Sequence, residues 1–174
     1  MLIRLSKEDF DTCWNYAKKI TKHRPDHPTY ATDYSRAAWE DDPLLNNYHA
    51  ALAEMSVAHA FDRPWNGGGL EAGLADVGDN IEVRHAKERH YGLVIKHKDC
   101  QSNFANVLCY VYDETWTDYI PGTVELIGWA GARRGYLLAG QCQAEHCCYI
   151  LNNYTRALGQ RHLRRFHQDE YRRL

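Results

Sequence analysis

The stretch ADVGDNIEVRHAKERHYGLVIKHKD, residues 75–99, decides the fold that we expect for this chain. The GDN segment at 78–80 predicts a tight turn, because glycine and asparagine tolerate positive φ and aspartate can bond its own backbone. The alternation of apolar and polar residues in IEVR at 81–84 then predicts a strand. We therefore expect the end of one strand, a turn and two further strands.

Polar residues gather around this predicted turn. Asp76 precedes it, and Glu82 and Arg84 follow it on one face of the strand, whereas His85 points to the opposite face. We expect the two carboxylates and the guanidinium to converge at the hairpin. A hard divalent metal and a phosphate together require such a combination of oxygen ligands and positive charge.

The composition predicts one globular domain over residues 1–174. A chain of this length buries roughly two-thirds of its unfolded surface, and 25% charged beside 44% apolar residues is not the composition of a disordered chain. The net charge of −2 argues against a protein that coats nucleic acid non-specifically. This net charge is compatible with a local basic groove, because binding of nucleic acid depends on the local electrostatic field and not on the summed charge.

The cysteines and the apolar runs predict a soluble cytoplasmic protein with free thiols. The six cysteines are irregularly spaced, and the apolar run at residues 1–5 is too short for a secretory signal. No stretch approaches the ~20 apolar residues of a membrane span, so we expect no membrane contact. Zinc at Cys142, His146, Cys147 and Cys148 is the weaker alternative, because no Cys-x-x-Cys pair occurs.

Two helices are predicted before the hairpin. Residues 6–23 form the first, opened by Ser6 and Asp9 as a capping box, and residues 44–61 form the second. The expected core stripe of the first helix is Phe10, Cys13, Trp14, Ala17 and Ile20. That of the second is Leu45, Tyr48, Leu52, Met55 and His59, with Ala51, Val57 and Ala58 alongside.

Strands at 1–5, 91–95, 107–112 and 124–129 complete the expected sheet, in which 107–112 is central because it is continuously apolar. We expect a meander flanked by the earlier helices, with the last of these strands ended by Gly128 and Gly131. Residues 155–174 are rich in arginine. They are consistent both with a phosphate-binding segment and with a solvated helix face.

Glu54 lies in the middle of the second predicted helix among small apolar residues, in the sequence ALAEMSVAHAF. One interpretation is a solvated glutamate on the helix surface. The other is a glutamate that faces the hairpin, where a metal is its natural partner, because an unpaired buried charge is costly. The sequence leaves both interpretations open.

Glu54 on a helix, Asp76 before the turn and Glu82-x-Arg84 on the next strand resemble the PD-(D/E)xK nuclease superfamily. The resemblance covers residues 44–129 and includes a phage-like pattern, ALAEMSVAHAFDRPW before DVGDNIEVR. In that family a helix acid, an aspartate and a Glu-x-Lys pair surround one or two magnesium ions. The resemblance implies an α/β fold with a restriction-endonuclease-like core, a central mixed β-sheet flanked by helices. It also implies metal-dependent hydrolysis of phosphodiester bonds.

The resemblance also implies a role for each residue. Asp76 and Glu82 would hold Mg²⁺ or Mn²⁺, Glu54 would complete the shell or position water, and Arg84 would meet the scissile phosphate. Arg84 stands where the family has lysine, and arginine stays charged and cannot act as a general base. Lys96 or Lys98 on the following strand is a candidate replacement for that amine.

The expected partner is nucleic acid, with DNA ahead of RNA, and the expected location is the cytoplasm, that of the host if a phage encodes the protein. Two alternatives stay open. One is the same fold without turnover, a module that binds nucleic acid or a protein partner. The other is a structural or interaction protein whose carboxylates are ordinary polar residues of a hairpin.

Overall fold

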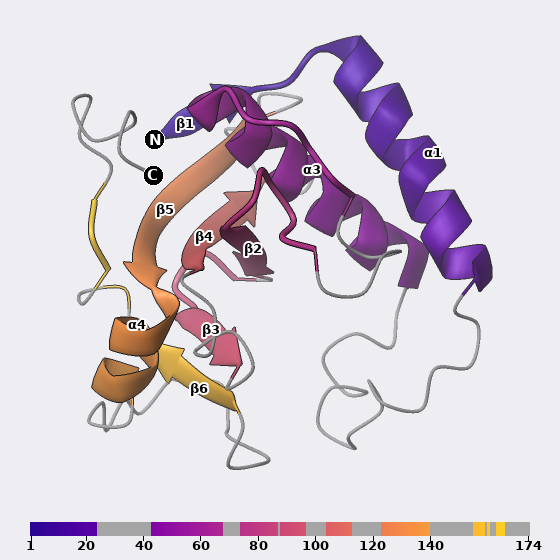
Figure 1. Cartoon of the computed structure of the whole chain (residues 1–174). Coiled ribbons are helices and arrows are strands. Elements are labelled where there is room, and N and C mark those ends of the chain that lie inside the picture. Colours follow the sequence, from indigo (N-terminus) through magenta and orange to yellow (C-terminus); the bar gives the residue numbers. More distant parts are fainter. Residues whose placement is uncertain are drawn as a thin grey trace.

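Figure 1 shows the computed structural model of the chain, which describes residues 1–23, 43–67, 74–86, 88–96, 104–112, 123–139, 155–158, 160 and 163–165. The fold is α/β, as predicted, with a mixed four-stranded sheet flanked by helices. The sheet has the order β1 (Leu2–Arg4), β5 (Thr123–Gly131), β4 (Ala105–Val111), β2 (Ile81–Ala86). A second sheet pairs β3 (Leu93–Lys96) with β6 (Thr155–Leu158).

The strand at 107–112 is central, as predicted: β4 lies inside the sheet and every one of its residues is buried. The expected meander is wrong. β2 and β4 run parallel, with Glu82 opposite Asn106, whereas β5 is antiparallel to both β1 and β4. Parallel neighbours need a crossover connection, and the chain between them includes β3, which belongs to the other sheet.

Of the two glycines predicted to end this strand, Gly131 is its last residue, as predicted, but Gly128 lies within it. β5 continues to Gly131, and its register with β4 shifts between Leu108 and Cys109, opposite Gly128 and its neighbours. A Cβ atom at Gly128 would lie 2.8 Å from the carbonyl oxygen of Arg164. Glycine is needed here because another backbone segment approaches β5 closely, which a strand glycine commonly marks.

Helix α1 (Lys7–His23) begins with the predicted capping box. Asp9 accepts a hydrogen bond from the Ser6 backbone N–H at 2.9 Å, and the Ser6 hydroxyl accepts one from the Asp9 N–H at 3.2 Å. Cys13, Ala17 and Ile20 are buried as expected. Trp14 is not a core residue, because it is 38% exposed and meets Tyr48 edge-on at the surface.

Helix α3 (Pro43–Phe61) packs its small side chains against the sheet. Its predicted stripe is wrong at both ends, because Leu45 and His59 are exposed. His59 instead lies 3.0 Å from Asp9 of α1 and links the two helices. The residues that are buried are Ala51, Leu52, Ala53, Ser56, Val57, Ala58 and Phe61. The three alanines and Ser56 are small, which allows the helix to approach the strands closely.

The helices form two layers around the four-stranded sheet. α3 packs against the sheet and α1 packs on the outer side of α3 (Figure 1). α4 (Ala132–Ala139), which the sequence did not predict, follows directly from the end of β5 near β3 and β6 (Figure 1). Separate apolar clusters fill the two sides, one around Val57, Val83 and Val107, the other around Leu93, Leu108 and Tyr136. In the described ranges, no helix is long and apolar enough to cross a membrane.

Candidate functional site

The turn before β2 places Asp76 beside that strand. Val77 and Ile81 exchange backbone hydrogen bonds of 3.0 and 3.2 Å, and Gly78 between them has a φ of 55°. The backbone N–H of Val83 donates to the Asp76 carboxylate at 2.7 Å. A tight hairpin and one buried hydrogen bond therefore fix a carboxylate at the edge of the four-stranded sheet.

Arg84 lies between the carboxylates of Asp76 and Glu82. Its Nη1 atom is 2.9 Å from Glu82 Oε2 and 3.6 Å from Asp76 Oδ2, and it also donates to the Val83 carbonyl at 2.9 Å. Glu82 and Arg84 can meet because residues two apart on a strand share a face. All three side chains are largely shielded from solvent, so these ion pairs are less screened than pairs on the surface.

Glu54 joins the cluster from α3. Burial, and next the charge of Asp76, raise the pKa of Glu54 to about 8, although a hydrogen bond from Trp65 and the charge of Arg84 act in the opposite direction. The Trp65 indole N–H donates to Glu54 Oε2 at 2.7 Å. Glu54 is therefore not a freely solvated residue of the helix surface, because its carboxylate is only partly exposed and is bound by the Trp65 indole.

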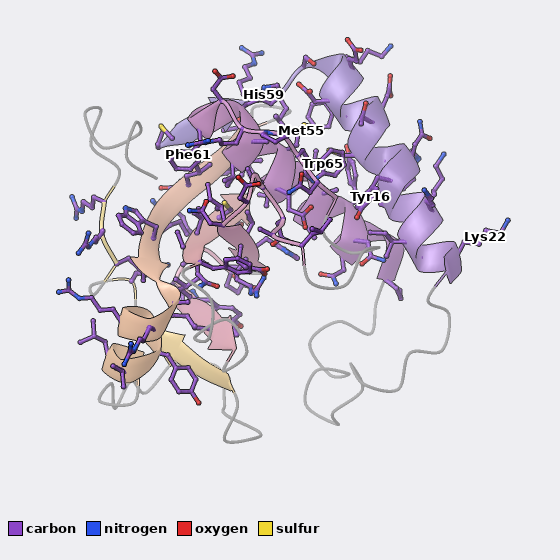
Figure 2. All side chains as sticks on the ribbon, in the orientation of Figure 1. Tyr16, Lys22, Met55, His59, Phe61 and Trp65 are labelled. Atoms are coloured by element: carbon purple, nitrogen blue, oxygen red, sulfur yellow. The ribbon has the colours of Figure 1, made fainter. Side chains whose placement is uncertain are left out.

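Trp65 is a supporting residue that the sequence did not indicate. Its backbone bridges Val77, and its ring packs edge-on against Tyr16 at 4.9 Å between α1 and α3 (Figure 2). The Tyr16 hydroxyl donates in turn to the Gly67 carbonyl. The sequence shows only a tryptophan in the short segment after α3. Its role follows from its contacts with Glu54, Tyr16 and Val77 in the structure.

His85 lies on the other side of the strand, as the alternation predicts. It is 3.1 Å from Asn46 of α3, and its ring is 6.4 Å from that of His49. Burial first, then the neighbouring charges, lower the pKa of His85 to about 4. His85 is therefore neutral at pH 7 and takes no part in the carboxylate cluster.

Asn106 is a second residue near the cluster that was not predicted from the sequence. It is fully buried on β4 directly opposite Glu82 and Ala130, and neither polar atom of its amide has a hydrogen-bond partner in the described part of the chain. An amide inside an otherwise apolar strand was the signal. Residues in register project from one face, so this amide flanks Glu82.

The described arrangement brings Asp76, Glu82 and Arg84 into contact, and the charges of all three act on Glu54. Arg84 binds two of the carboxylates and Trp65 binds the third. No group of three or more His, Cys, Asp or Glu side chains among the described residues is arranged to hold a metal ion. Lys96, one candidate replacement for the missing lysine, is on β3, which pairs with β6 in the other sheet. Lys98, the other candidate, lies outside the described residues.

Cys13 and Cys109 are buried free thiols, as predicted. Burial raises the pKa of Cys13 to about 12, and that of Cys109 is raised for the same reason, so both are protonated at neutral pH and behave as small core residues. The other four cysteines, His146 and most of the basic segment at 155–174 lie outside the described residues.

Comparison with known protein families, curated proteins and solved structures gives no match to this chain. Its function therefore has to be inferred from the chemistry of the cluster. That chemistry consists of three carboxylates with hard oxygen atoms, one permanent cation, and a location at the edge of a sheet. Each carboxylate comes from a different segment: α3, the turn, and β2.

Proposed function

We propose that the chain is a metal-dependent nuclease-like protein that hydrolyses phosphodiester bonds of nucleic acid at the cluster of Glu54, Asp76, Glu82 and Arg84. The convergence of these four side chains carries the proposal. Burial, and next the charge of Asp76, disfavour ionisation of Glu54, and the single charge of Arg84 balances only one of the carboxylates of Asp76 and Glu82. A site whose task is to bind a cation accounts for this excess of carboxyl groups.

The donor set fits magnesium or manganese in its chemistry, because carboxylate oxygens are the ligands that these hard ions prefer. Asp76 and Glu82 would hold the ion, with Glu54 completing the set. When bound, the ion would polarise a water molecule and the phosphate. Since Arg84 engages Asp76 and Glu82 in the described structure, metal uptake requires these ion pairs to open.

Arg84 would bind the phosphate. Its guanidinium has five N–H donors in a planar fork, which suits two phosphate oxygens at once. A fixed positive charge at this position would also stabilise the negative charge that develops in the transition state. Arg84 cannot accept a proton from water, so deprotonation of the nucleophile has to come from another group.

A second candidate function follows from the distances of 2.9 and 3.6 Å between Arg84 and the two carboxylates. In this alternative the guanidinium replaces the metal permanently, and the protein is a module that binds nucleic acid or a protein partner without cleaving it. Removing one member of a buried ion pair costs about 3–5 kcal/mol. A cluster built around Arg84 would therefore be part of the folding framework.

The experiment that separates these candidates is a cleavage assay on single- and double-stranded DNA and RNA. The native protein is incubated with magnesium or manganese, and with EDTA as the metal-free control. The test variants are Asp76→Asn and Glu82→Gln. The matched control is Asp79→Asn, which removes an exposed carboxylate from the same turn.

The proposal expects metal-dependent cleavage by the native protein and by Asp79→Asn, and loss of cleavage in both test variants. Absence of cleavage by the native protein on every substrate, with no heat of magnesium binding in calorimetry, would overturn it. That result would favour the module without turnover. A thermal melt of each variant verifies that loss of activity is not loss of fold.

A further inference from the structure

Trp65 and its neighbours in the segment 64–67 connect α1 and α3. The Trp65 indole N–H donates to Glu54 Oε2 at 2.7 Å, and the Trp65 ring lies 4.9 Å from that of Tyr16 (Figure 2). The Tyr16 hydroxyl donates to the Gly67 carbonyl. Gly67 has a φ of 60°, and a Cβ atom there would lie 2.8 Å from the Tyr16 ring. Packing on α1 therefore fixes the position from which the indole reaches the glutamate.

The same segment is tied to the turn that carries Asp76. The backbone N–H of Asn66 donates to the Asp76 carbonyl at 3.0 Å. The side-chain amide of Asn66 donates to the carbonyls of Ala75 at 3.0 Å and Gly78 at 2.5 Å. The Gly78 N–H donates in return to the Pro64 carbonyl at 2.8 Å. These bonds lie on both sides of Asp76, so the indole and the carboxylate of the turn belong to one hydrogen-bonded unit.

In both Glu54 and Asp76, one carboxylate oxygen is engaged by a donor of the protein. In Glu54 it is Oε2, which accepts the indole N–H at 2.7 Å, and in Asp76 it is Oδ2, which accepts the Val83 backbone N–H at 2.7 Å. Hydrogen bonds to an ionised carboxylate are among the strong ones, and each occupies a lone pair of its acceptor oxygen. Coordination of a cation through both oxygens of either carboxylate therefore competes with a hydrogen bond.

The hard divalent cations differ in how they use carboxylates. Mg²⁺ demands near-octahedral geometry and keeps several of its waters, so it takes few carboxylate oxygens. Ca²⁺ takes about six to eight oxygen ligands and accepts both oxygens of one carboxylate. Carboxylates that each offer one oxygen more readily than the other suit the smaller ion. Glu54 is the one at which this can be tested, because its donor is a side chain, whereas that of Asp76 is a backbone N–H.

We infer that Trp65 is a positioning residue that sets the ion specificity of the cluster. Its indole N–H holds Oε2 of Glu54, so that Glu54 meets a cation through one oxygen, and this shifts the preference of the cluster from Ca²⁺ towards Mg²⁺ or Mn²⁺. The inference rests on the proposed function, because it concerns the ion that the cluster would take up. Trp65 acts through Glu54 and not through contact with the ion.

The test compares the affinities of the full chain for Mg²⁺ and for Ca²⁺, each measured by isothermal titration calorimetry at pH 8.5. The variant is Trp65→Phe, which keeps an aromatic ring beside Tyr16 but removes the N–H donor. The matched control is Trp14→Phe, the same substitution at a tryptophan that is 38% exposed and meets Tyr48 at the surface. Thermal melts in EDTA verify the fold of each variant.

The decisive quantity is the dissociation constant for Ca²⁺ divided by that for Mg²⁺. We expect this ratio to fall roughly two- to tenfold in Trp65→Phe, the factor that corresponds to the net contribution of one hydrogen bond. A looser fold, or a change in the protonation of Glu54, affects both ions alike and cancels in the ratio. Trp14→Phe should keep the native ratio. In a Glu54→Gln background, which has no second carboxylate oxygen, Trp65→Phe should no longer change the ratio.

A second measurement needs only the native protein and therefore holds even where Trp65→Phe does not fold. The indole N–H resonance of Trp65, assigned through its proximity to the Tyr16 ring, reports on the hydrogen bond to Glu54. We expect this resonance to keep its hydrogen-bonded position in saturating Mg²⁺. A shift to the position of a free indole in water would show that Glu54 leaves Trp65 when the ion binds, and would overturn the inference.

The outcomes separate this inference from the proposed function. An unchanged ratio in Trp65→Phe rejects the role of the indole but leaves the proposed function standing, because the cluster then binds its ion without that donor. Equal falls in the ratio for Trp65→Phe and Trp14→Phe likewise reject a role specific to Trp65. If the native protein gives no heat of binding with either ion, the proposed function and this inference are both rejected.

Discussion

Arg84 is the residue at which the chemistry of the cluster is decided. A guanidinium holds a fixed charge at any pH that the fold survives, so it can bind carboxylates or phosphate but cannot exchange a proton with water. In the described structure it binds Glu82 and Asp76. These contacts hold the cluster together in the described structure, and a metal ion would have to replace them.

Replacement of Arg84 by lysine distinguishes these two roles. Lysine keeps a positive charge, releases part of the cluster because it has no planar fork, and restores the residue of the family that the motif resembles. We expect Arg84→Lys to keep or raise magnesium-dependent cleavage. Arg84→Gln, the control without charge, should lose it. The measurement is the initial rate of cleavage of a labelled oligonucleotide, and an inactive lysine variant beside an active native protein would contradict the expectation.

Glu54 makes the stability of the metal-free protein depend on pH. Its folded pKa of about 8 is above the ordinary value of 4.5, so the folded state binds the proton more tightly than the unfolded chain. The protonated carboxyl therefore contributes stability that is complete below pH 4.5 and is lost as the pH rises through 8. Between pH 4.5 and pH 8 the free energy of unfolding therefore falls by at most roughly 1.4 kcal/mol per pH unit.

We accordingly expect Glu54→Gln, which keeps an acceptor for Trp65, to lack this decline. Relative to the native protein, its free energy of unfolding should rise between pH 5 and pH 8 and stay level above pH 9. Urea denaturation in EDTA at each pH measures it. Glu8→Gln, in the exposed first turn of α1, should follow the native curve. Parallel curves for Glu54→Gln and the native protein would show that Glu54 titrates normally.

Single residues were predictable from the sequence where the reason is local. Glu82 and Arg84 share a face because of strand alternation, and Ser6 with Asp9 caps α1 because their spacing allows it. Whether Glu54 faces the hairpin could not be decided from the sequence, because it depends on how α3 packs against β2. The roles of Trp65 and Asn106 could not be found, because each is defined by a partner distant in sequence.

At the scale of elements, β5 is shaped by a neighbour that the sequence does not reveal. Its hydrophobic pattern predicted a strand, but glycine at 128 suggested an end. The strand continues because Gly128 accommodates the extended segment around Arg164. A local pattern cannot distinguish a glycine that ends a strand from one that admits a second backbone.

A pair of glycine substitutions in β5 tests this explanation. Alanine at Gly128 would place its Cβ 2.8 Å from the Arg164 carbonyl and 2.9 Å from the Leu163 Cβ atom, whereas alanine at Gly131 would meet nothing within 4 Å. We expect Gly128→Ala to lower the free energy of unfolding by about 1–3 kcal/mol, as overpacking does. Gly131→Ala should change it by less than about 0.5 kcal/mol. Equal effects in a urea titration would contradict the close approach.

At the scale of the whole molecule, the fold class followed from the order of the elements, but the path of the chain did not. The helices α1 and α3 and the five strands β1 to β5 were predicted near their actual bounds. The parallel pairing of β2 with β4 was missed because the pattern of single strands carries no information on which strands are neighbours. Helix α4 was not predicted, because a helix of only eight residues gives a weak periodic signal.

The carboxylate cluster joins α3, the turn and β2, so a bound cation should stabilise the whole fold. A ligand that binds only the folded state adds about 2.7 kcal/mol at a concentration one hundred times its dissociation constant. For a chain of this size, each kcal/mol raises the melting temperature by about 2–4 °C. We therefore expect saturating magnesium chloride to raise the melting temperature of the native protein by several degrees, measured by calorimetric scans with and without the salt.

The rise should depend on pH in a particular direction. Glu54 has to lose its proton to act as a ligand, and its pKa is about 8 without metal, so the proton competes with the ion below that pH. The rise in melting temperature should accordingly be small at pH 6, larger at pH 7 and largest at pH 8.5. Asp79→Asn should reproduce this series, whereas Asp76→Asn should show no rise at any pH. A similar rise in Asp76→Asn, or in native protein given sodium chloride of equal ionic strength, would mean that magnesium acts through general screening and that Arg84 is the only cation the cluster holds.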